Sequence, residues 1–388
     1  MRTSNWRSNV VVAAALVCAA GAGSAQAEEA EAKGGLAGAM EPVYSVLSND
    51  DEGYDLSDSI LGPDSAYDFG GWLAVGYNSN KTGLFNSHNN VNMTQLWLYT
   101  AKSMDTSEGF DWGFRFDAMF GTDGADTQAF GSTPGKWDFQ NGLDDGKYGA
   151  AFPQLYAEVG YKDISIKAGH FYTPVGYEVV TAPDNFFYSH AFTMYLSEPF
   201  THTGFLATYS GIEGVDIFGG WSAGWDTGFD QYNDGSNFLG GVALTPADWA
   251  KVTYTMTAGD LGWIGSGYSH SLVADVNVTE KLNWVFQSDY VDVDEQGANY
   301  ETIGVNQYLI YALTEKIGLG TRVEWWRGNN TDYYALTAGI NFKVLPNLML
   351  RPEFRYQWSP EVEDDPTVNT AGVPVDQGAF AFDAIFTF

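Results

Sequence analysis

The stretch that decides the fold reads Phe152-Pro-Gln-Leu-Tyr-Ala-Glu-Val-Gly-Tyr161, then Lys162-Asp163, then Ile164-Ser-Ile-Lys-Ala-Gly169. On both sides of the Lys162-Asp163 pair, apolar residues alternate with polar ones. A period of two is the spacing of a β-strand, in which successive side chains point to opposite faces. Two such runs around a tight polar turn predict a β-hairpin with one apolar and one polar face.

A long aromatic segment, Phe171 to Thr201, follows this hairpin, and alternation resumes at Thr203. It is too aromatic for a solvated loop, because exposed apolar patches of this size are rare without a function. We therefore expect a long loop that folds inward and buries its rings, with its polar residues left facing water. The residues expected to form a constriction are Tyr177, Glu178, Asp184, Asn185, Phe186, Phe187 and Glu198. Packing at the rim without a constriction is the alternative.

The N-terminus has the pattern of a secretory signal peptide over residues 1–27. Arg2 and Arg7 precede an apolar run from Val10 to Ala20, and Ala25-Gln-Ala27 matches an A-x-A cleavage site. The only cysteine, Cys18, lies in this run, so we expect a mature chain without disulfides or cysteine-bound metals. Residues 28–67 are acidic and rich in Gly and Ser, and are interpreted as a disordered periplasmic leader. A short helix that caps the barrel is the alternative.

The composition restricts the possible partners. The chain has 18 Lys and Arg residues against 49 Asp and Glu residues, a formal net charge of −31. This excludes a nucleic-acid partner, which requires a basic surface. No apolar run reaches the length of a membrane helix, yet β-barrels carry their hydrophobicity in alternation and stay compatible with the sequence.

Alternation continues from Asp68 to Phe388, most clearly in Phe110–Phe120, where aromatic residues occupy one face and charged residues the other. Short turns alternate with long loops, as in outer-membrane barrels. The short turns lie at Lys162-Asp163, 279–281, 314–316 and 345–347, and the long loops at 122–150, Asp292–Tyr300, 226–236 and 359–377. We predict that residues 68–388 form an all-β, antiparallel transmembrane β-barrel of about 16 strands. It should close by pairing Phe380–Phe388 with Asp68–Tyr77, because lipid cannot satisfy a free strand edge.

Three segments in and beside the aromatic loop resemble the signature region of the OmpL-like β-barrel porin family. They read Gly169-His-Phe-Tyr-Thr-Pro-Val-Gly-Tyr-Glu178, Asn185-Phe-Phe-Tyr-Ser-His190 and Glu198-Pro-Phe-Thr-His-Thr-Gly204. The resemblance implies an outer-membrane porin-like protein of a Gram-negative-type cell envelope. The terminal Phe388 is similar to the closing aromatic residue that barrel-assembly machinery recognises in such proteins. The resemblance names a class and no substrate.

Parity along the strands predicts which charged side chains point into the barrel. The predicted pore-lining residues are Asp111, Arg115, Asp117, Glu158, Lys167, Lys251, Asp275, Asp289, Arg322, Glu324, Arg351, Glu353 and Arg355. Facing arginine and carboxylate groups would set a transverse field that orients polar solutes. The alternative is that these pairs only brace the wall.

These patterns predict a passive pore for small hydrophilic solutes or ions, without a cofactor or a metal, embedded in outer-membrane lipid. The negative charge predicts cation preference, and association into a homo-oligomer stays open. One alternative is a structural or adhesive surface barrel without an open channel. Another is an outer-membrane hydrolase using Ser266, Ser269 and His270, although the G-x-S-x-G spacing is absent. Because no complete catalytic constellation is found, we expect no enzyme activity.

Overall fold

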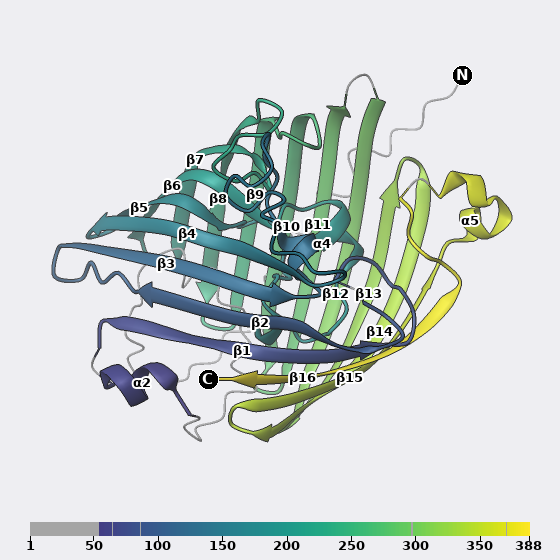
Figure 1. The fold of residues 1–388 in the computed structure, drawn as a ribbon, viewed down its shortest axis with the longest axis horizontal. Helices are drawn as coiled ribbons and strands as arrows, with labels where there is room; N and C mark the ends of the chain where they lie inside the picture. The colour runs from purple at the N-terminus through teal and green to yellow at the C-terminus, as the bar shows by residue number, and fades with distance from the viewer. Residues whose placement is uncertain (1–53, 64, 86, 296–297, 370) are drawn as a thin grey trace. The chain divides into compact units, whose positions relative to one another are not determined.

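The alternating runs form sixteen strands, each hydrogen-bonded to its neighbours in one closed antiparallel barrel (Figure 1). The computed structural model describes residues 54–63, 65–85, 87–295, 298–369 and 371–388. The strands are β1 (Tyr67–Asn78), β2 (Val91–Lys102), β3 (Phe110–Gly121), β4 (Gly149–Tyr161), β5 (Ile164–Tyr172), β6 (Thr201–Ile212), β7 (Val215–Trp225), β8 (Ser236–Ala247), β9 (Ala250–Asp260), β10 (Ser266–Thr279), β11 (Leu282–Glu295), β12 (Ala298–Thr314), β13 (Ile317–Gly328), β14 (Thr331–Leu345), β15 (Leu348–Trp358) and β16 (Gln377–Thr387). The predicted all-β antiparallel barrel and its strand number are confirmed.

The first and last strands close the barrel. β1 pairs with β16 in a register that runs from Trp72 opposite Thr387 to Asn78 opposite Ala381. Beyond this ladder, Phe388 and Gly71 exchange two backbone hydrogen bonds of 2.9 Å. The predicted closing pair is therefore confirmed, and the sheet has no free edge to leave unsatisfied in lipid.

The hairpin of β4 and β5 forms as predicted. Glu158 lies opposite Lys167 in its register, and Lys162 adopts a φ of 54° in the turn. Such left-handed backbone is what a tight hairpin turn demands. β5 continues to Tyr172, so the aromatic loop begins slightly later than the sequence indicated.

The two faces of the strands differ as a lipid-embedded barrel requires. On β3, Phe110 is 70% exposed, whereas Asp117 on the opposite face is fully buried. On β15, Phe354 is 53% exposed between the buried Glu353 and Arg355. Exposed apolar rings outside and buried charged groups inside are the reverse of a soluble domain, and they fit an apolar band facing hydrocarbon.

The connections alternate in length, with one correction. Residues Asp292–Tyr300 were expected to form a long loop, but β11 extends to Glu295 and β12 begins at Ala298. Asp292 lies opposite Glu301 in this ladder. The acidic side chains that suggested a loop leave the backbone hydrogen bonds of the strands intact, so acidity here did not mark the end of a strand.

Short helical segments occupy the longer connections and the N-terminal side of β1. They are α3 (Gly124–Thr127), α5 (Pro360–Asp364), η4 (Pro366–Val368) and α2 (Leu56–Leu61). None of the helices in the described ranges is long and apolar enough to cross a bilayer.

The leader is described only from Tyr54 onward, and the predicted signal peptide lies outside the described residues. Asp55 caps α2 by accepting a hydrogen bond from the backbone of Asp58, which is a favourable start for a helix. The backbone of Tyr54 exchanges two hydrogen bonds with the side chain of Asn347 in the β14–β15 turn. This contact attaches the end of the leader to the short-turn side of the barrel.

Candidate pore and its inward-folded loop

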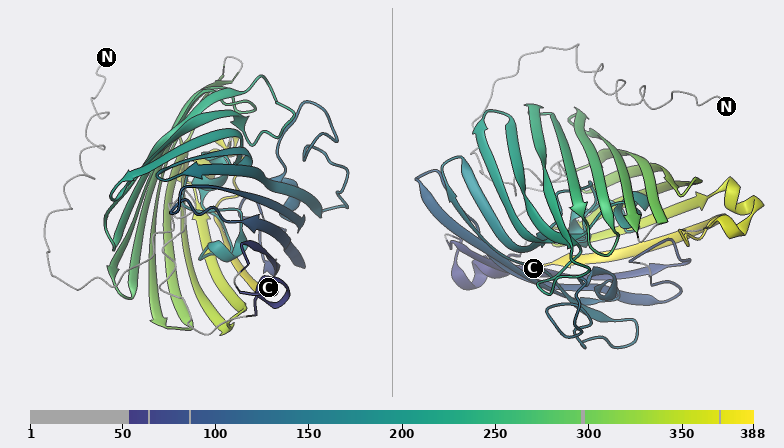
Figure 2. Two further views of the ribbon diagram at one scale, coloured as in Figure 1. Left: turned by 90° about the vertical axis from the view of Figure 1, so that its left-hand side faces the viewer. Right: turned by 90° about the horizontal axis from the view of Figure 1, so that it is seen from above.

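The connection between β5 and β6, residues 173–200, lies within the barrel and is here called the inner loop (Figures 1 and 2). It contains a 3-10 turn, η3 (Ala182–Asp184), and one short helix, α4 (Phe192–Leu196). α4 contacts the inner faces of β12 and β13, on the far side of the barrel from the strand at which the loop starts. The loop thus crosses the interior.

The aromatic rings of the inner loop are buried, as predicted, against apolar side chains of the wall. Phe186 and Phe187 pack in one cluster with Val285, Tyr308 and Ile310. Phe192 packs on the neighbouring strands β13 and β14 in a cluster that includes Trp326 and Tyr333. Burying such rings contributes roughly 1.5–3 kcal/mol each, which offsets the entropy of ordering the loop.

Arg322 of β13 holds the first half of the inner loop. Its Nη1 donates to Glu178 at 2.6 Å and to the Ser189 carbonyl at 2.7 Å, while its Nε donates to Glu324 at 2.7 Å. Both carboxylates and the guanidinium are buried. Buried charges are tolerated when every donor and lone pair finds a partner, and this cluster satisfies that condition.

Glu324 also binds the second half of the loop. One oxygen accepts from the backbone N–H of Phe192 at the start of α4, at 2.8 Å, and both oxygens accept from Arg355. The Arg355 guanidinium lies 4.7 Å from the ring centre of Phe192. One carboxylate therefore joins two wall arginines to the loop backbone.

The middle of the inner loop is bound by β15 and β16. Arg351 forms a bidentate pair with Asp383, at 2.9 and 2.6 Å, and donates to the carbonyls of Ala182 and Asn185. Glu353 accepts from the backbone N–H groups of Tyr188 at 2.8 Å and of Ser189 at 3.2 Å. These bonds satisfy backbone groups that water would otherwise have to reach.

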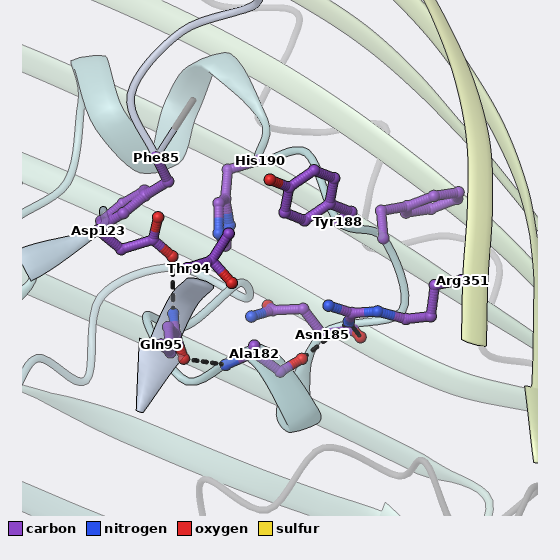
Figure 3. A pocket seen from close by; sticks show the side chains of 10 residues that line it. Phe85, Thr94, Gln95, Asp123, Ala182, Asn185, Tyr188, His190 and Arg351 are labelled. Carbon is purple, nitrogen blue, oxygen red and sulfur yellow. Dashed lines mark hydrogen bonds between the residues drawn. The ribbon is translucent and has the colours of Figure 1, made fainter. Parts of the chain in front are cut away.

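A small cavity remains between the inner loop, the wall of β2 and β15, and the connection that follows β3 (Figure 3). Gln95 bridges its two sides, since its amide donates to Asp123 and its carbonyl accepts from the backbone of Ala182. Burial raises the pKa of Asp123 to about 7, against the lowering effect of the Gln95 hydrogen bond. The other lining residues are Phe85, Thr94, Asn185, Phe187, Tyr188, His190 and Arg351.

The last turn of the loop lies against β11. The Gln287 amide donates to Glu198 at 2.6 Å and to Asp289 at 2.5 Å. Next to it, the Trp326 indole donates to the Ser197 hydroxyl at 2.9 Å. The loop is thus hydrogen-bonded to the wall along its whole length.

The pKa values of the two buried glutamates in the inner loop, Glu178 and Glu198, are shifted in opposite directions. Burial alone would raise the pKa of Glu178, but Arg322 and the hydrogen bonds of His190 and Ala191 outweigh it and lower the pKa to about 2. Burial raises the pKa of Glu198 well above its ordinary value, and the nearby Asp289 adds to that rise.

The expectation that the polar loop residues face water is wrong for three of them. Glu178, Asn185 and Glu198 are 5–8% exposed, and only Asp184 is exposed. Wall groups occupy their hydrogen-bonding atoms instead. Arg322, Glu324, Arg351, Glu353 and Arg355 point inward as predicted, but they are buried and contact the loop rather than a water-filled bore.

A second set of predicted inward groups remains partly exposed on the wall of β3–β5 and β9: Asp111, Arg115, Glu158, Lys167 and Lys251. Arg115 pairs with the buried Asp117 at 2.7 Å, and Lys167 lies 4.2 Å from the ring centre of Tyr156. Asp275 and Asp289 of the same predicted lining are buried on β10 and β11. Apart from Asp117, the predicted lining charges on β3–β5 and β9 are therefore partly accessible to solvent, whereas those on β10, β11, β13 and β15 are buried.

The residues considered for hydrolysis do not assemble. Ser269 bonds Thr257 on the buried face of β10, while His270 on the other face bonds the Tyr254 hydroxyl. Ser266 donates to Asp260 at 3.3 Å. Within the described ranges, no group of three or more His, Cys, Asp or Glu residues is placed to hold a metal ion.

Sequence reasoning missed the neutral wall residues that fix the loop, chiefly Gln95, Gln287 and Tyr308. Tyr308 donates to Glu178 at 3.0 Å from β12. Their position in the alternation marks such residues as inward, but a neutral side chain carries no charge that would single it out as a pore-lining group.

Comparisons with known proteins agree with this architecture. The family model described as "Putative beta-barrel porin-2, OmpL-like" matches residues 66–388. None of the curated proteins matches the sequence. Among solved structures, the anion-selective porin of Comamonas acidovorans superposes with a TM-score of 0.55 at 10% identity, covering 83% of this chain and 99% of that one.

Two further solved structures share the fold. The outer-membrane protein OmpT of Vibrio cholerae, in its trimer form, has a TM-score of 0.54 at 11% identity, with 83% and 99% coverage. The outer-membrane channel DcaP of Acinetobacter baumannii has a TM-score of 0.54 at 10% identity, with 83% and 97% coverage. The match over residues 66–388 places this chain in the OmpL-like β-barrel porin family, among outer-membrane porins.

Proposed function

We propose that the chain forms a passive pore for small hydrophilic solutes in the outer membrane of a Gram-negative-type envelope, narrowed by the inner loop. The observation that carries this proposal is the asymmetry of the interior. Arg322 and Arg351 bind the loop and Arg355 contacts its Phe192 ring on one wall, while Arg115 and Lys167 on the other remain partly exposed. Solutes would pass along that exposed wall, between its charges and the loop.

Charge supports a preference for cations. The chain carries a net charge of −31, and the partly exposed Asp111 and Glu158 accompany the inward Arg115 and Lys167. The basic groups of the opposite wall are neutralised in buried pairs, so they contribute little to the field in the passage. Cations should therefore be enriched, less so at high salt.

The proposal includes three further features. Residues 1–27 would direct export and be removed, Phe388 would present the closing strand to the barrel-assembly machinery, and several copies could associate in the membrane. Because the hydrolase candidates face opposite sides of β10 or are bonded elsewhere, the proposed function includes no catalysis. A closed structural barrel is the competing function, since the loop is packed so tightly.

Single-channel recording in a planar bilayer under a salt gradient tests the proposal. The full chain should give a small conductance with a reversal potential on the cation side. Deletion of residues 179–196 should raise the conductance, because it removes the segment that occupies the interior. Circular dichroism of the deletion variant should retain the β-sheet spectrum. No current from either protein would favour the closed structural barrel, and an unchanged conductance would remove the loop from the pore.

A further inference from the structure

Two carboxyl groups meet where the inner loop returns to the wall. Glu198 is 6% exposed and Asp289 on β11 is 1% exposed. One amide nitrogen, Nε2 of Gln287, donates to both of them, at 2.6 and 2.5 Å. Because both accept from one nitrogen atom, the two carboxyl groups lie next to each other. Ser271 lies opposite Asp289 in the ladder of β10 and β11, and the Gln287 amide also lies 3.5 Å from the Thr193 hydroxyl.

Within the described residues, no cationic side chain pairs with either carboxyl group. The elements packed against them contribute hydroxyl and amide groups: Ser271 from β10, Thr193 from α4, and Asn306 from β12 through its bond to Thr193. Glu178 is the other charged group that interacts electrostatically with Glu198, and it is itself paired with Arg322 and His190. Two like charges in one buried site repel each other strongly, so both groups cannot remain ionised.

A proton fits this site better than a metal ion. A metal ion would be coordinated by oxygen atoms, yet Gln287 directs its N–H₂ group at the carboxyl oxygens. One Asp289 oxygen, Oδ1, is buried without a hydrogen-bond partner. The two carboxyl groups therefore lack a hydrogen-bond donor and not an acceptor. A proton held between the carboxyl groups supplies one donor and removes one charge.

We propose that Glu198 and Asp289 share one proton while the inner loop is docked, and that losing this proton at alkaline pH releases the C-terminal end of the loop from β11 and widens the pore. This rests on the proposed function, because it takes the loop as the segment that narrows the passage. The Arg322 end would stay attached, so the device loosens one end of the loop and leaves the barrel closed on itself.

The direction of the pH dependence follows from Glu198. Docking raises the pKa of this group, so its contribution to docking is fully present below the ordinary carboxyl range. The contribution is lost as the pH rises through the raised pKa. Above that value, the ratio of docked to released loop should fall by up to about tenfold for each pH unit.

The experiment measures single-channel conductance of the full chain from about pH 5 to about pH 9. The wild type should show a conductance that rises with pH. Glu198→Gln and Asp289→Asn each place a neutral amide where the shared proton lies, so both variants should keep the low conductance at every pH. Glu363→Gln, which changes an exposed acid of α5, is the matched control and should keep the rise.

Each outcome decides between explanations. A flat wild-type profile with measurable current, or a rise that persists in both amide variants, would overturn the shared proton but not the pore. Absence of current in every variant and in the 179–196 deletion would instead overturn the pore. If Ca²⁺ or a chelator at fixed pH changed the conductance of the wild type and not of Glu198→Gln, the pair would be a cation site, and the proton proposal would fall.

Discussion

The two ends of the inner loop contain the same kind of residue in opposite surroundings. Near its start, buried Glu178 meets Arg322 at 2.6 Å, and its pKa falls to about 2. Near its end, buried Glu198 meets Asp289, and burial with this like charge raises its pKa. The partner across the interior, rather than the depth of burial, decides whether a loop carboxylate stays charged.

The comparison also separates the responses of the two ends to pH. The contribution of Glu178 to docking is present above the ordinary carboxyl pKa and is lost only as the pH falls toward about 2. The contribution of Glu198 is lost in the opposite direction, as the pH rises. Around neutral pH Glu178 stays ionised, so of the two loop glutamates only Glu198 responds to a pH change there.

The largest effect should come from removing the cation of the first end. Arg322→Met keeps most of the side-chain volume but leaves Glu178 and Glu324 buried with one partner fewer, a loss of about 3–5 kcal/mol. The free energy of unfolding from lipid vesicles in urea measures this loss. The control is Arg327→Met at the rim, where the arginine is 47% exposed in its pair with Asp332 and should cost about 1 kcal/mol or less. Equal losses in the two variants would mean that the buried cluster does not hold the loop.

A smaller loss of stability is expected from a substitution that crowds the Glu198 carboxylate at the second end of the loop. Gly176 has a φ of +88°, and a Cβ atom there would lie 1.7 Å from the Glu198 carboxylate. Gly135 has a similar φ of +76° with nothing within 4 Å, so Gly135→Ala carries the backbone strain without the contact. Gly176→Ala should therefore unfold more easily than Gly135→Ala by about 1–3 kcal/mol. It should also shift the rise in conductance to lower pH, because a displaced Glu198 loses its place beside Gln287.

Similar stabilities and unchanged pH profiles for the two alanine variants would contradict this. Such a result would mean that the Glu198 side chain can move aside without a loss of stability. Its position beside Asp289 would then not be fixed by the loop backbone.

The barrel was predictable from sequence because the alternation of apolar and polar residues within each strand identifies its lipid-facing and inward-facing sides. Alternation in Phe110–Phe120 and in Phe380–Phe388 predicted strands there, and the need to close the sheet predicted the pairing of β1 with β16. Local reasoning failed at Asp292–Tyr300, where acidic side chains do not interrupt the strand ladder.

The interior was less predictable, because parity states that a side chain points inward but not what it meets there. Glu178 and Arg322 are 144 positions apart, and only the closed barrel with its inner loop brings them together. The prediction of water-facing loop acids failed for the same reason. It placed the aromatic rings against the wall correctly, but it assigned no wall partners to the carboxylates between them.

The smallest effect should come from the middle of the loop, where binding involves backbone donors. Glu353 accepts from the N–H groups of Tyr188 and Ser189, and Glu353→Gln keeps the shape of the side chain while removing its charge. Hydrogen bonds to charged groups contribute more than neutral ones, so the variant should lose about 1 kcal/mol in unfolding free energy. Because those donors do not titrate, the conductance of Glu353→Gln should still rise with pH as in the wild type. A flattened pH profile would show that the middle and the C-terminal end of the loop are released together. The loop would then dock as one unit, and its two ends would not respond to pH separately.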